Sequence, residues 1–438
     1  MLIEFEFENF LSYDRKTIFT MEATKGSKLS NHINNKNRIL PIAAVFGGNA
    51  SGKSNFIKAI EFSRDVILGI ESDFNNFYNL RFRGGHTNNN IGIFKYKFCI
   101  ENKVYSYLLK YDYLNKEILY EELIDEKKHF SIYLRNENRD IYYAEKMLIQ
   151  SEKKRLNFYI EDFQNEKQST SFLSYIALKA STKSVFFDYI NKAFTFFTNI
   201  IIIKPTSKFI PINLLFSEKN IKNTLYNYGL NIENIAQKEV PLSSIIDIDN
   251  EDSRKNILEH IKFSQMKEYS IIHNDIPYIF KLDETGNLKA FKIFFVHSNE
   301  ELFEYEEESD GTKRILDLLP ITYMMNKEYR IILVDEIDRS LSVHMSYNFL
   351  KTFIQEIENM TIDGQLIFTT HNIQFLDFNL LRKDEIWFVE NEREDLGSSL
   401  TKFSNISFRT DMDLKTAFWK GKVGGVSKRL INNMKKCA

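Results

Sequence analysis

The segment 39–54, ILPIAAVFGGNASGKS, constrains the fold more than any other part of the chain. Residues 39–46 form a short and almost wholly apolar run, which is typical of a strand buried on both faces of a sheet. Residues 47–54 fit the pattern G-x-x-x-x-G-K-S, and residues 55–67 carry apolar side chains at roughly helical spacing. A buried strand, a glycine-rich loop and a helix in this order predict a phosphate-binding loop in an α/β sheet. A chance glycine-rich turn is the alternative.

The chemistry expected of this loop follows from its residue types. Gly47 and Gly52 let the backbone turn so that successive N–H groups point at a phosphate, and the start of the next helix adds partial positive charge. We expect Lys53 to contact the β- and γ-phosphates of ATP and to take part in catalysis, and the Ser54 hydroxyl to ligate Mg²⁺. The other residues predicted to contact the nucleotide here are Asn49, Ala50, Ser51 and Asn55.

A second run, residues 331–336 (IILVDE), consists of four apolar residues followed by two carboxylates. A buried strand that ends before Asp335 delivers this carboxylate to the carboxyl edge of the sheet, where it can hold Mg²⁺ directly or through water. Glu336 is placed to polarise the attacking water as a general base. A strand ending in solvated acidic residues is the alternative, and the phosphate loop favours the functional interpretation.

Two further motifs flank this predicted acidic strand in the sequence. Residues 308–312 (ESDGT) open a predicted helix, in which Ser309 can cap the N-terminus and Gly311 lets a phosphate approach the backbone. Residues 365–371 (QLIFTTH) predict a strand that ends at His371, whose imidazole can reach the γ-phosphate or the attacking water. An ordinary capped helix and a surface histidine are the alternatives. The order of all four motifs favours a nucleotide site.

The chain is predicted to divide into three regions. Residues 1–150 form an N-terminal lobe with the phosphate loop and an antiparallel meander over 91–124. Residues 151–300 form a helical and mixed insertion, with a hairpin that turns near Thr285-Gly286-Asn287. Residues 301–438 form a C-terminal lobe with an α/β rhythm: helices over 314–325 and 346–360, and strands over 329–334, 365–369 and 385–389.

Composition favours a large globular protein of the cytoplasm. Hydrophobic residues make up 43% of the 438 residues, enough for a sizeable core. Cys99 and Cys437 stand far apart, so we expect neither a disulfide framework nor a zinc site, in keeping with a reducing compartment. No apolar run reaches the roughly 20 residues that span a bilayer, the alternating start MLIEFEFENF is not a signal peptide, and we expect no membrane partner. The net charge of −2 gives no global argument for nucleic acid.

In this order the four motifs resemble the ABC-type ATPase head of transporters, SMC proteins, Rad50 and RecF. Residues 309–312 look like a variant of the signature loop, usually Ser-Gly-Gly-Gln or Ser-Gly-Gly-Glu, with Asp310 as the departure, and His371 matches the switch histidine. The resemblance implies an ABC-type head with a mixed sheet, an antiparallel β meander and a helical insertion. It also implies that ATP and Mg²⁺ are bound between two subunits, so that Ser309, Gly311 and Thr312 contact the nucleotide of the other copy in a homodimer or higher symmetric oligomer. The glutamine loop of such heads has three candidates, Gln150, Gln164 and Gln168.

A closer resemblance covers most of the chain. The segments ESDGTKRILDLLP, LVDEIDRSL, QLIFTTHN, LLRKDEIWFVE and a C-terminal W-K-G-K-V-G-G are similar to bacterial AAA15/AAA21-type ATPases of anti-phage and abortive-infection systems, a group that includes ATPases of PARIS, Septu and retron systems. That family often reads DEID-x-S-L-H-P. Here Ser342-Val343-His344 follows Leu341, so the role of the family histidine is not carried over to His344. The resemblance implies a sensor or regulator that responds to a phage protein or nucleic acid and controls a separate toxic effector encoded nearby.

Two other functions stay open at this point. One is a DNA-repair ATPase of the RecF or Rad50 type that binds DNA in an ATP-dependent way, and the other is a scaffold that binds nucleotide without hydrolysing it. We expect no nuclease domain after His371, because the stretch is too short for its own core, and we expect Asp411-Met412-Asp413 to be a solvated turn. The basic segment 415–436 fits contact with nucleic acid phosphates, an acidic partner or a solvated terminal helix.

Overall fold

The structure is a computed structural model that describes most of the chain. The described residues are 1–25, 28–33, 37–70, 76–84, 89–179, 184–205, 221–245, 257–258, 268–273, 276–327, 329–359, 364–393, 397–406 and 414–419. Asp411-Met412-Asp413 and residues 420–438 lie outside the described residues, so the expectations for the acidic turn, the basic segment and most of the W-K-G-K-V-G-G sequence remain predictions.

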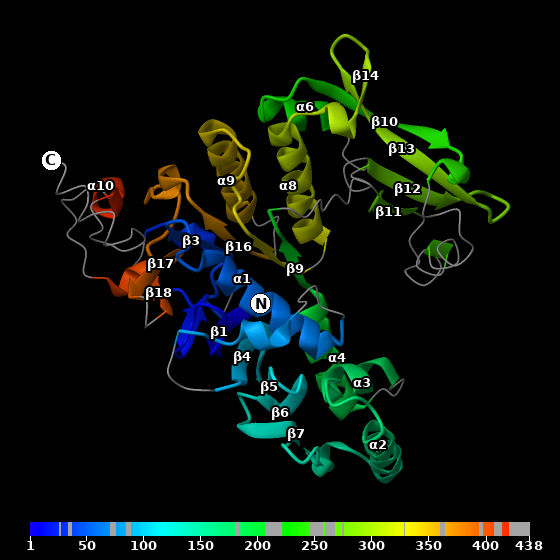
Figure 1. The fold of residues 1–438 in the computed structure, drawn as a ribbon, viewed down its shortest axis with the longest axis vertical. Helices are drawn as coiled ribbons and strands as arrows, with labels where there is room; N and C mark the ends of the chain where they lie inside the picture. Colours follow the sequence, from blue (N-terminus) through cyan, green and yellow to red (C-terminus); the bar gives the residue numbers. More distant parts are fainter. Residues whose placement is uncertain are drawn as a thin grey trace. The chain divides into compact units, whose positions relative to one another are not determined.

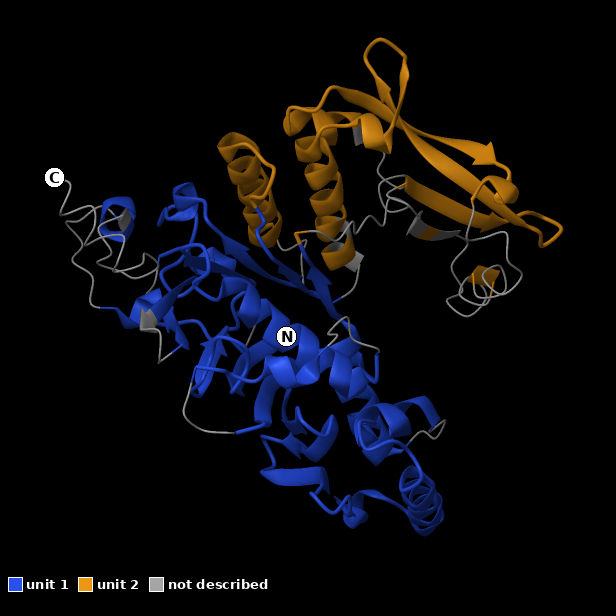
Figure 2. Ribbon diagram, in the orientation of Figure 1, with its two compact units in different colours: residues 1–204, 328–337, 363–438 blue, residues 205–327, 338–362 orange. Residues whose placement is uncertain are grey.

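The chain forms two compact units (Figure 2). Unit 1 contains residues 1–204, 328–337 and 363–438, and unit 2 contains residues 205–327 and 338–362. The predicted boundaries at 150 and 300 do not coincide with this division. The reason is that strand β9 (Ile200–Ile203) pairs with β15 (Ile331–Val334) in a sheet of unit 1, so the chain stays in that unit through residue 204.

The first sheet of unit 1 is antiparallel and contains the N-terminal strand (Figure 1). Strand β1 alternates as predicted, since Phe5 and Phe7 are fully buried while Glu4 and Glu6 of the opposite face pair in register with lysines of β4. The predicted meander over 91–124 is confirmed as β4, β5 and β6. In spatial order the seven strands are β2 (Thr17–Thr20), β1 (Leu2–Glu8), β4 (Ile91–Ile100), β5 (Lys103–Asp112), β6 (Glu117–Asp125), β7 (Phe130–Arg135) and β8 (Ile141–Tyr143).

The second sheet of unit 1 is mixed, with five parallel strands and one antiparallel edge strand. Every residue of β3, β15 and β16 is buried, as their apolar runs predicted. The prediction of an α/β fold with a mixed sheet and an antiparallel meander is therefore confirmed. In spatial order the strands are β18 (Gly397–Lys402), β17 (Ile386–Arg393), β3 (Ile42–Gly47), β16 (Gln365–Thr370), β15 and β9, and only β18 is antiparallel to its neighbour.

Helix α1 (Lys53–Leu68) lies between the two sheets (Figure 1). Its Phe56 is fully buried and contacts the ring of Phe19 on β2 at a centroid distance of 4.9 Å, while the helix also packs against β3. The predicted helical character of residues 150–200 is confirmed as α2 (Gln150–Phe163), α3 (Phe172–Lys179) and α4 (Val185–Thr198). Helices α3 and α4 pack against α1, and α10 (Leu414–Trp419) is the last described element.

Unit 2 has a sheet and two long helices of its own. The predicted hairpin is confirmed: between β12 and β13 the Asp283 carboxylate accepts hydrogen bonds from the backbone N–H groups of Thr285 and Asn287. Helices α8 (Asp310–Lys327) and α9 (Val343–Glu358) correspond to the helices predicted over 314–325 and 346–360, and both begin earlier than predicted. The other elements are α6 (Ile221–Asn227) and the antiparallel strands β10 (Ile232–Val240), β13 (Leu288–His297), β12 (Ile276–Leu282) and β11 (Glu268–His273), with β14 (Leu302–Glu304) paired to β13. Among the helices of the described residues, none combines the length and the apolar character needed to cross a membrane.

Candidate functional site

Three neighbouring parallel strands bring the predicted site residues of unit 1 to one edge of its mixed sheet. Strand β3 ends at Gly47, β15 ends just before Asp335, and β16, which lies between them, ends just before His371. The carboxyl ends of adjacent parallel strands lie side by side, and ligands of open α/β sheets bind at this edge. Residues that are far apart in the sequence therefore meet where a ligand is expected.

The loop between β3 and α1 needs its glycines. Gly52 has φ = 111°, a conformation that glycine adopts without strain and other residues do not. A side chain at Gly47 would place its Cβ only 2.7 Å from the carbonyl oxygen of Val389 on β17. These steric requirements distinguish the loop from a chance glycine-rich turn.

The start of α1 leaves helix N–H groups for a ligand. No side chain caps this N-terminus, and the residue at the cap position is Gly52. The first N–H groups of a helix have no acceptor within the helix, and together with the helix dipole they favour an anion. The backbone at this edge therefore fits a phosphate.

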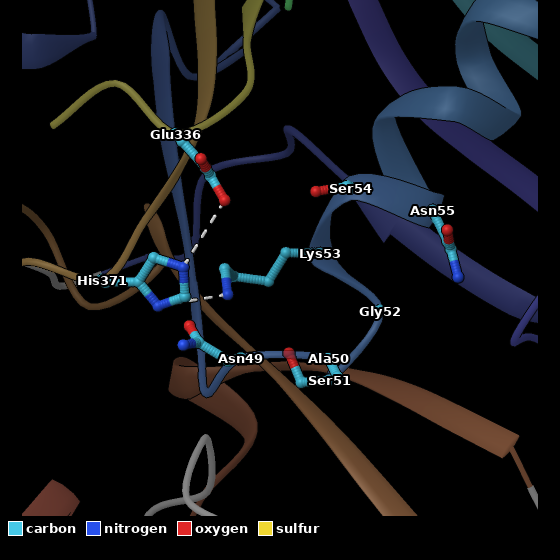
Figure 3. Close-up of a pocket in the computed structure, with 9 residues that line it drawn as sticks. All are labelled: Asn49, Ala50, Ser51, Gly52, Lys53, Ser54, Asn55, Glu336 and His371. Atoms are coloured by element: carbon cyan, nitrogen blue, oxygen red, sulfur yellow. Dashed lines mark hydrogen bonds and ion pairs between the residues drawn. The ribbon is translucent and has the colours of Figure 1, made fainter. Parts of the chain in front are cut away.

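Lys53 is folded over its own loop. Its Nζ donates to the carbonyl oxygens of Gly47 and Gly48 at 2.9 Å each and lies 3.4 Å from Nδ1 of His371 (Figure 3). Because an ammonium group can only donate, we infer that Nδ1 accepts and that the imidazole proton sits on Nε2. Phosphate oxygens are acceptors of the same kind as the two loop carbonyls and can take their place.

A pocket of about 410 Å³ lies beside the loop. In Figure 3 the side chains of Lys53, Ser54, Glu336 and His371 point toward one space, whereas that of Asn55 points away from it. All residues that line the pocket are among those predicted to form the site: Asn49, Ala50, Ser51, Gly52, Lys53, Ser54, Asn55, Glu336 and His371.

Asp335 is buried and is not one of the residues that line this pocket. Its Oδ1 accepts a hydrogen bond of 2.5 Å from Oγ1 of Thr369, and the same threonine oxygen accepts the backbone N–H of Glu336 at 2.7 Å. Thr369 is fully buried on β16. One hydroxyl group therefore holds Asp335 and the backbone of Glu336 in a fixed relation to each other.

Glu336 and His371 both have partly exposed side chains. Oε1 of Glu336 lies 3.8 Å from Nε2 of His371, and the two side chains are 34% and 35% exposed. Glu336 has φ = 50°, in the left-handed region, where residues with side chains are uncommon and often functional. This conformation turns the chain directly after β15, and the Glu336 carboxylate faces the pocket.

The predicted signature residues belong to unit 2. Ser309 caps α8 as predicted, since its Oγ accepts the N–H of Thr312 at 3.1 Å and lies 2.9 Å from Oγ1 of the same residue. A Cβ at Gly311 would lie 3.1 Å from the carbonyl oxygen of Ser340, so the glycine permits a close approach of two backbone segments. Ser309 and Asp310 are exposed at this helix start.

The three glutamine candidates lie within or shortly after α2. Gln150 begins α2, the Gln164 side chain donates to the carbonyl of Arg139, and the Gln168 carbonyl accepts from Arg135. None of the three lines the pocket. The assignment of a glutamine loop stays a prediction.

Sequence reasoning missed four residues that support the site: Ser12, Tyr13, Thr369 and Ser398. Thr369 had a usable signal, because a hydroxyl group near the end of a buried strand and next to the acidic strand needs a polar partner. Ser12 and Tyr13 follow β1 and Ser398 lies on β18, so their contacts with the loop depend on the tertiary fold. No local pattern marks them.

Several solved structures are similar to this chain. An SMC head domain from Thermotoga maritima has 13% identity and a TM-score of 0.39, covering 92% of this chain and 98% of that chain. An Smc head bound to the C-terminal winged-helix domain of ScpA has 16% identity and a TM-score of 0.42, covering 95% and 99%. An Smc head domain with an extended coiled coil, bound to the C-terminal domain of ScpA derived from Pyrococcus furiosus, has 14% identity and a TM-score of 0.43, covering 99% of each chain. No curated protein matches the sequence.

A family match covers the whole of the candidate site. Residues 42–377 match the AAA_21 family, described as "AAA domain, putative AbiEii toxin, Type IV TA system". The matched range begins in β3 and includes the phosphate loop, Asp335, Glu336 and His371. Since the match covers more than half of the chain, the protein belongs to the AAA_21 family.

Proposed function

We propose that this protein binds ATP with Mg²⁺ at the pocket of unit 1 and hydrolyses it. The observation that carries the proposal is the convergence of Lys53, Ser54, Glu336 and His371 on one pocket beside an uncapped helix N-terminus. The loop supplies N–H donors and a cation for phosphates, and the acidic side supplies a base for water. A site that only binds phosphate would not require the carboxylates of Asp335 and Glu336.

The residues present fit a magnesium ion. The Ser54 hydroxyl and the Asp335 carboxylate are hard oxygen donors, which Mg²⁺ prefers, and the hydrogen bond from Thr369 fixes the orientation of Asp335. Since Asp335 does not line the pocket, a contact through water suits it, while Ser54 faces the pocket directly. When bound, Mg²⁺ neutralises charge on the β- and γ-phosphate oxygens.

Glu336 is the proposed general base. It accepts a proton from the attacking water, whose oxygen forms a bond to the γ-phosphorus as the bond to the β–γ bridging oxygen breaks and ADP leaves. The Nε2–H of His371, next to the Glu336 carboxylate, can orient the water or donate to the γ-phosphate. Lys53 moves from the loop carbonyls to the phosphates as ATP enters.

We further propose that hydrolysis switches a homodimer between two states and that the protein regulates a separate effector of an anti-phage system in the cytoplasm. Support for the dimer is the signature loop at residues 309–312, which presents the exposed Ser309 at a helix N-terminus. Support for a toxin-related role is the family description, which names a toxin of a toxin–antitoxin system.

The decisive variant is Glu336→Gln, which keeps the shape of the side chain and removes its basicity. We expect ATP turnover to fall about 100-fold or more while ATP affinity changes little, because the base acts only in the transition state. The measurement is steady-state phosphate release together with equilibrium ATP binding. Equal turnover in wild type and variant removes the general-base assignment.

The same variant tests the switch, since it holds ATP without hydrolysing it. We expect a dimer with ATP and a looser state with ADP by light scattering, and co-purification of the neighbouring gene product with one of these states. A monomer with both ATP and ADP contradicts the proposed dimer. Failure of the neighbouring gene product to co-purify with either nucleotide contradicts the proposed regulatory role.

A further inference from the structure

Two hydroxyl groups hold the phosphate loop from the side away from the pocket. Oγ of Ser398, on β18, donates to the carbonyl oxygen of Ser51 at 2.6 Å. The phenol of Tyr13, in the segment after β1, donates to the carbonyl oxygen of Gly52 at 3.1 Å. Neither Ser398 nor Tyr13 lines the pocket, whereas Ser51 and Gly52 do.

The geometry of the peptide bond links these contacts to the pocket. A trans peptide is planar, and its C=O and N–H groups point in opposite directions. Holding the Ser51 carbonyl toward Ser398 therefore aims the N–H of Gly52 the opposite way. The Gly52 carbonyl accepts both the Tyr13 phenol and the backbone N–H of Phe56, and these two contacts together aim the N–H of Lys53. These are two consecutive N–H groups of the loop that is expected to cradle phosphate.

Ser398 is in turn held by hydrogen bonds to Ser12, which also contacts the first turn of α1. The backbone N–H of Ser398 donates to the Ser12 carbonyl at 2.6 Å, and the two serine Oγ atoms lie 2.9 Å apart. Asn55 Nδ2 donates to Oγ of Ser12 at 2.9 Å, which ties the support to the first turn of α1. A Cβ at Gly52 would lie 2.8 Å from Oγ of Ser12, so the loop packs directly on these hydroxyl groups.

Both hydroxyl donors, Ser398 and Tyr13, are buried. Ser398 is 8% exposed and Tyr13 is fully buried. Burial raises the pKa of the Tyr13 phenol well above its usual range, so the group remains a donor wherever the protein is folded. Burial of both side chains limits the access of water to these contacts, and a loop that is ordered before the ligand arrives binds it at a lower entropic cost.

We propose that Tyr13 and Ser398 are positioning residues that pre-organise the Gly52 and Lys53 N–H groups for the β-phosphate of a nucleotide. The inference rests on the proposed function for the identity of the ligand. The two N–H groups meet the same phosphate in the ground state and the transition state. Loss of either support therefore weakens nucleotide affinity and leaves the rate of the bound complex unchanged.

The test compares two variants with two matched controls. Tyr13→Phe and Ser398→Ala each remove one hydroxyl group from the support. Tyr96→Phe removes an equally buried hydroxyl that instead contacts Ser63 and the Ile60 carbonyl, and Ser399→Ala changes the next residue of β18. The measurements are calorimetric binding of ATP and of ADP, KM and kcat for ATP, and thermal melting of all four variants.

We expect each support variant to bind ATP and ADP about 5-fold more weakly, with a raised KM and an unchanged kcat, since a hydrogen bond is worth about 1 kcal/mol. ATP and ADP change alike because both carry a β-phosphate. Tyr96→Phe is expected to melt at a lower temperature, as Tyr13→Phe does, but to keep wild-type affinity. Ser398→Ala carries the test alone if Tyr13→Phe does not fold.

The results distinguish failure of the positioning role from failure of the proposed function. Wild-type affinity in both support variants, or an equal loss of affinity in Tyr96→Phe, overturns the positioning role while the proposed function stands. A wild-type protein that binds neither ATP nor ADP overturns the proposed function and this inference together.

Discussion

Two helices of this protein have a glycine at or next to their first residue, and their N-termini differ in capping. At the start of α1 no side chain caps the helix, and Gly52 occupies the cap position. At the start of α8 the Oγ of Ser309 accepts the N–H of Thr312. A serine cap typically contributes about 1 kcal/mol, so α8 is satisfied by its own sequence, whereas α1 gives up that stabilisation.

The difference shows which of the two termini depends on a ligand. The α1 terminus opens on a pocket with Lys53, where a phosphate can supply the missing acceptor. The α8 terminus is exposed, and its Thr312 N–H already donates to Ser309, so a phosphate that takes this N–H must displace an existing hydrogen bond. We therefore expect changes at α1 to act on nucleotide binding first, and changes at α8 to act on helix stability first.

Lys53→Ala tests the ligand-dependent terminus and has the largest expected effect in this comparison. We expect ATP affinity to fall on the order of 100-fold, because a charge-assisted contact to phosphate is lost and two loop carbonyls lose their donor. Equilibrium binding of ATP is the measurement. Lys58→Ala, an exposed position on the same helix, serves as the control and is expected to bind normally. Wild-type affinity in Lys53→Ala would refute the phosphate-loop assignment.

Thr369→Val sharpens the comparison on the acidic side of the same pocket. The hydroxyl group that contacts both Asp335 and the N–H of Glu336 is removed at nearly constant volume. We expect kcat to fall about 10-fold with little change in ATP affinity, because the general base loses its fixed position but the loop does not. Thr369→Ser keeps the hydroxyl and is expected to recover most of the rate. A serine variant as slow as the valine variant would assign the effect to packing instead.

Prediction from sequence succeeded where the determining pattern is local. The apolar run before Gly47 and the alternation around Phe5 each specify a strand by their own spacing, and the spacing from Gly47 to Ser54 specifies the loop. Ser398 and Tyr13 could not be found in this way, since their contacts with the loop exist only after β1 and β18 are placed. The pairing of β9 with β15 likewise joins residues that no short pattern connects.

Ser309→Ala tests the capped N-terminus of α8. Its expected effect, a loss of stability, is the smallest in this comparison. Ser342 is a matched control, because its Oγ caps α9 by accepting the N–H of Met345 at 3.2 Å, in the same unit. Alanine at either position should lower the free energy of unfolding by about 1 kcal/mol, which is measured as a shift of the urea midpoint.

The two serine variants are expected to separate in activity. If Ser309 also meets the nucleotide of a second copy, Ser309→Ala lowers ATP turnover and dimer formation by more than its stability loss accounts for, whereas Ser342→Ala keeps both. Equal turnover in the two variants would mean that Ser309 is a helix cap and nothing more. The contrast between α1 and α8 would then describe one ligand-binding terminus and one purely structural terminus, and the second half of the proposed site would have to be sought elsewhere on the chain.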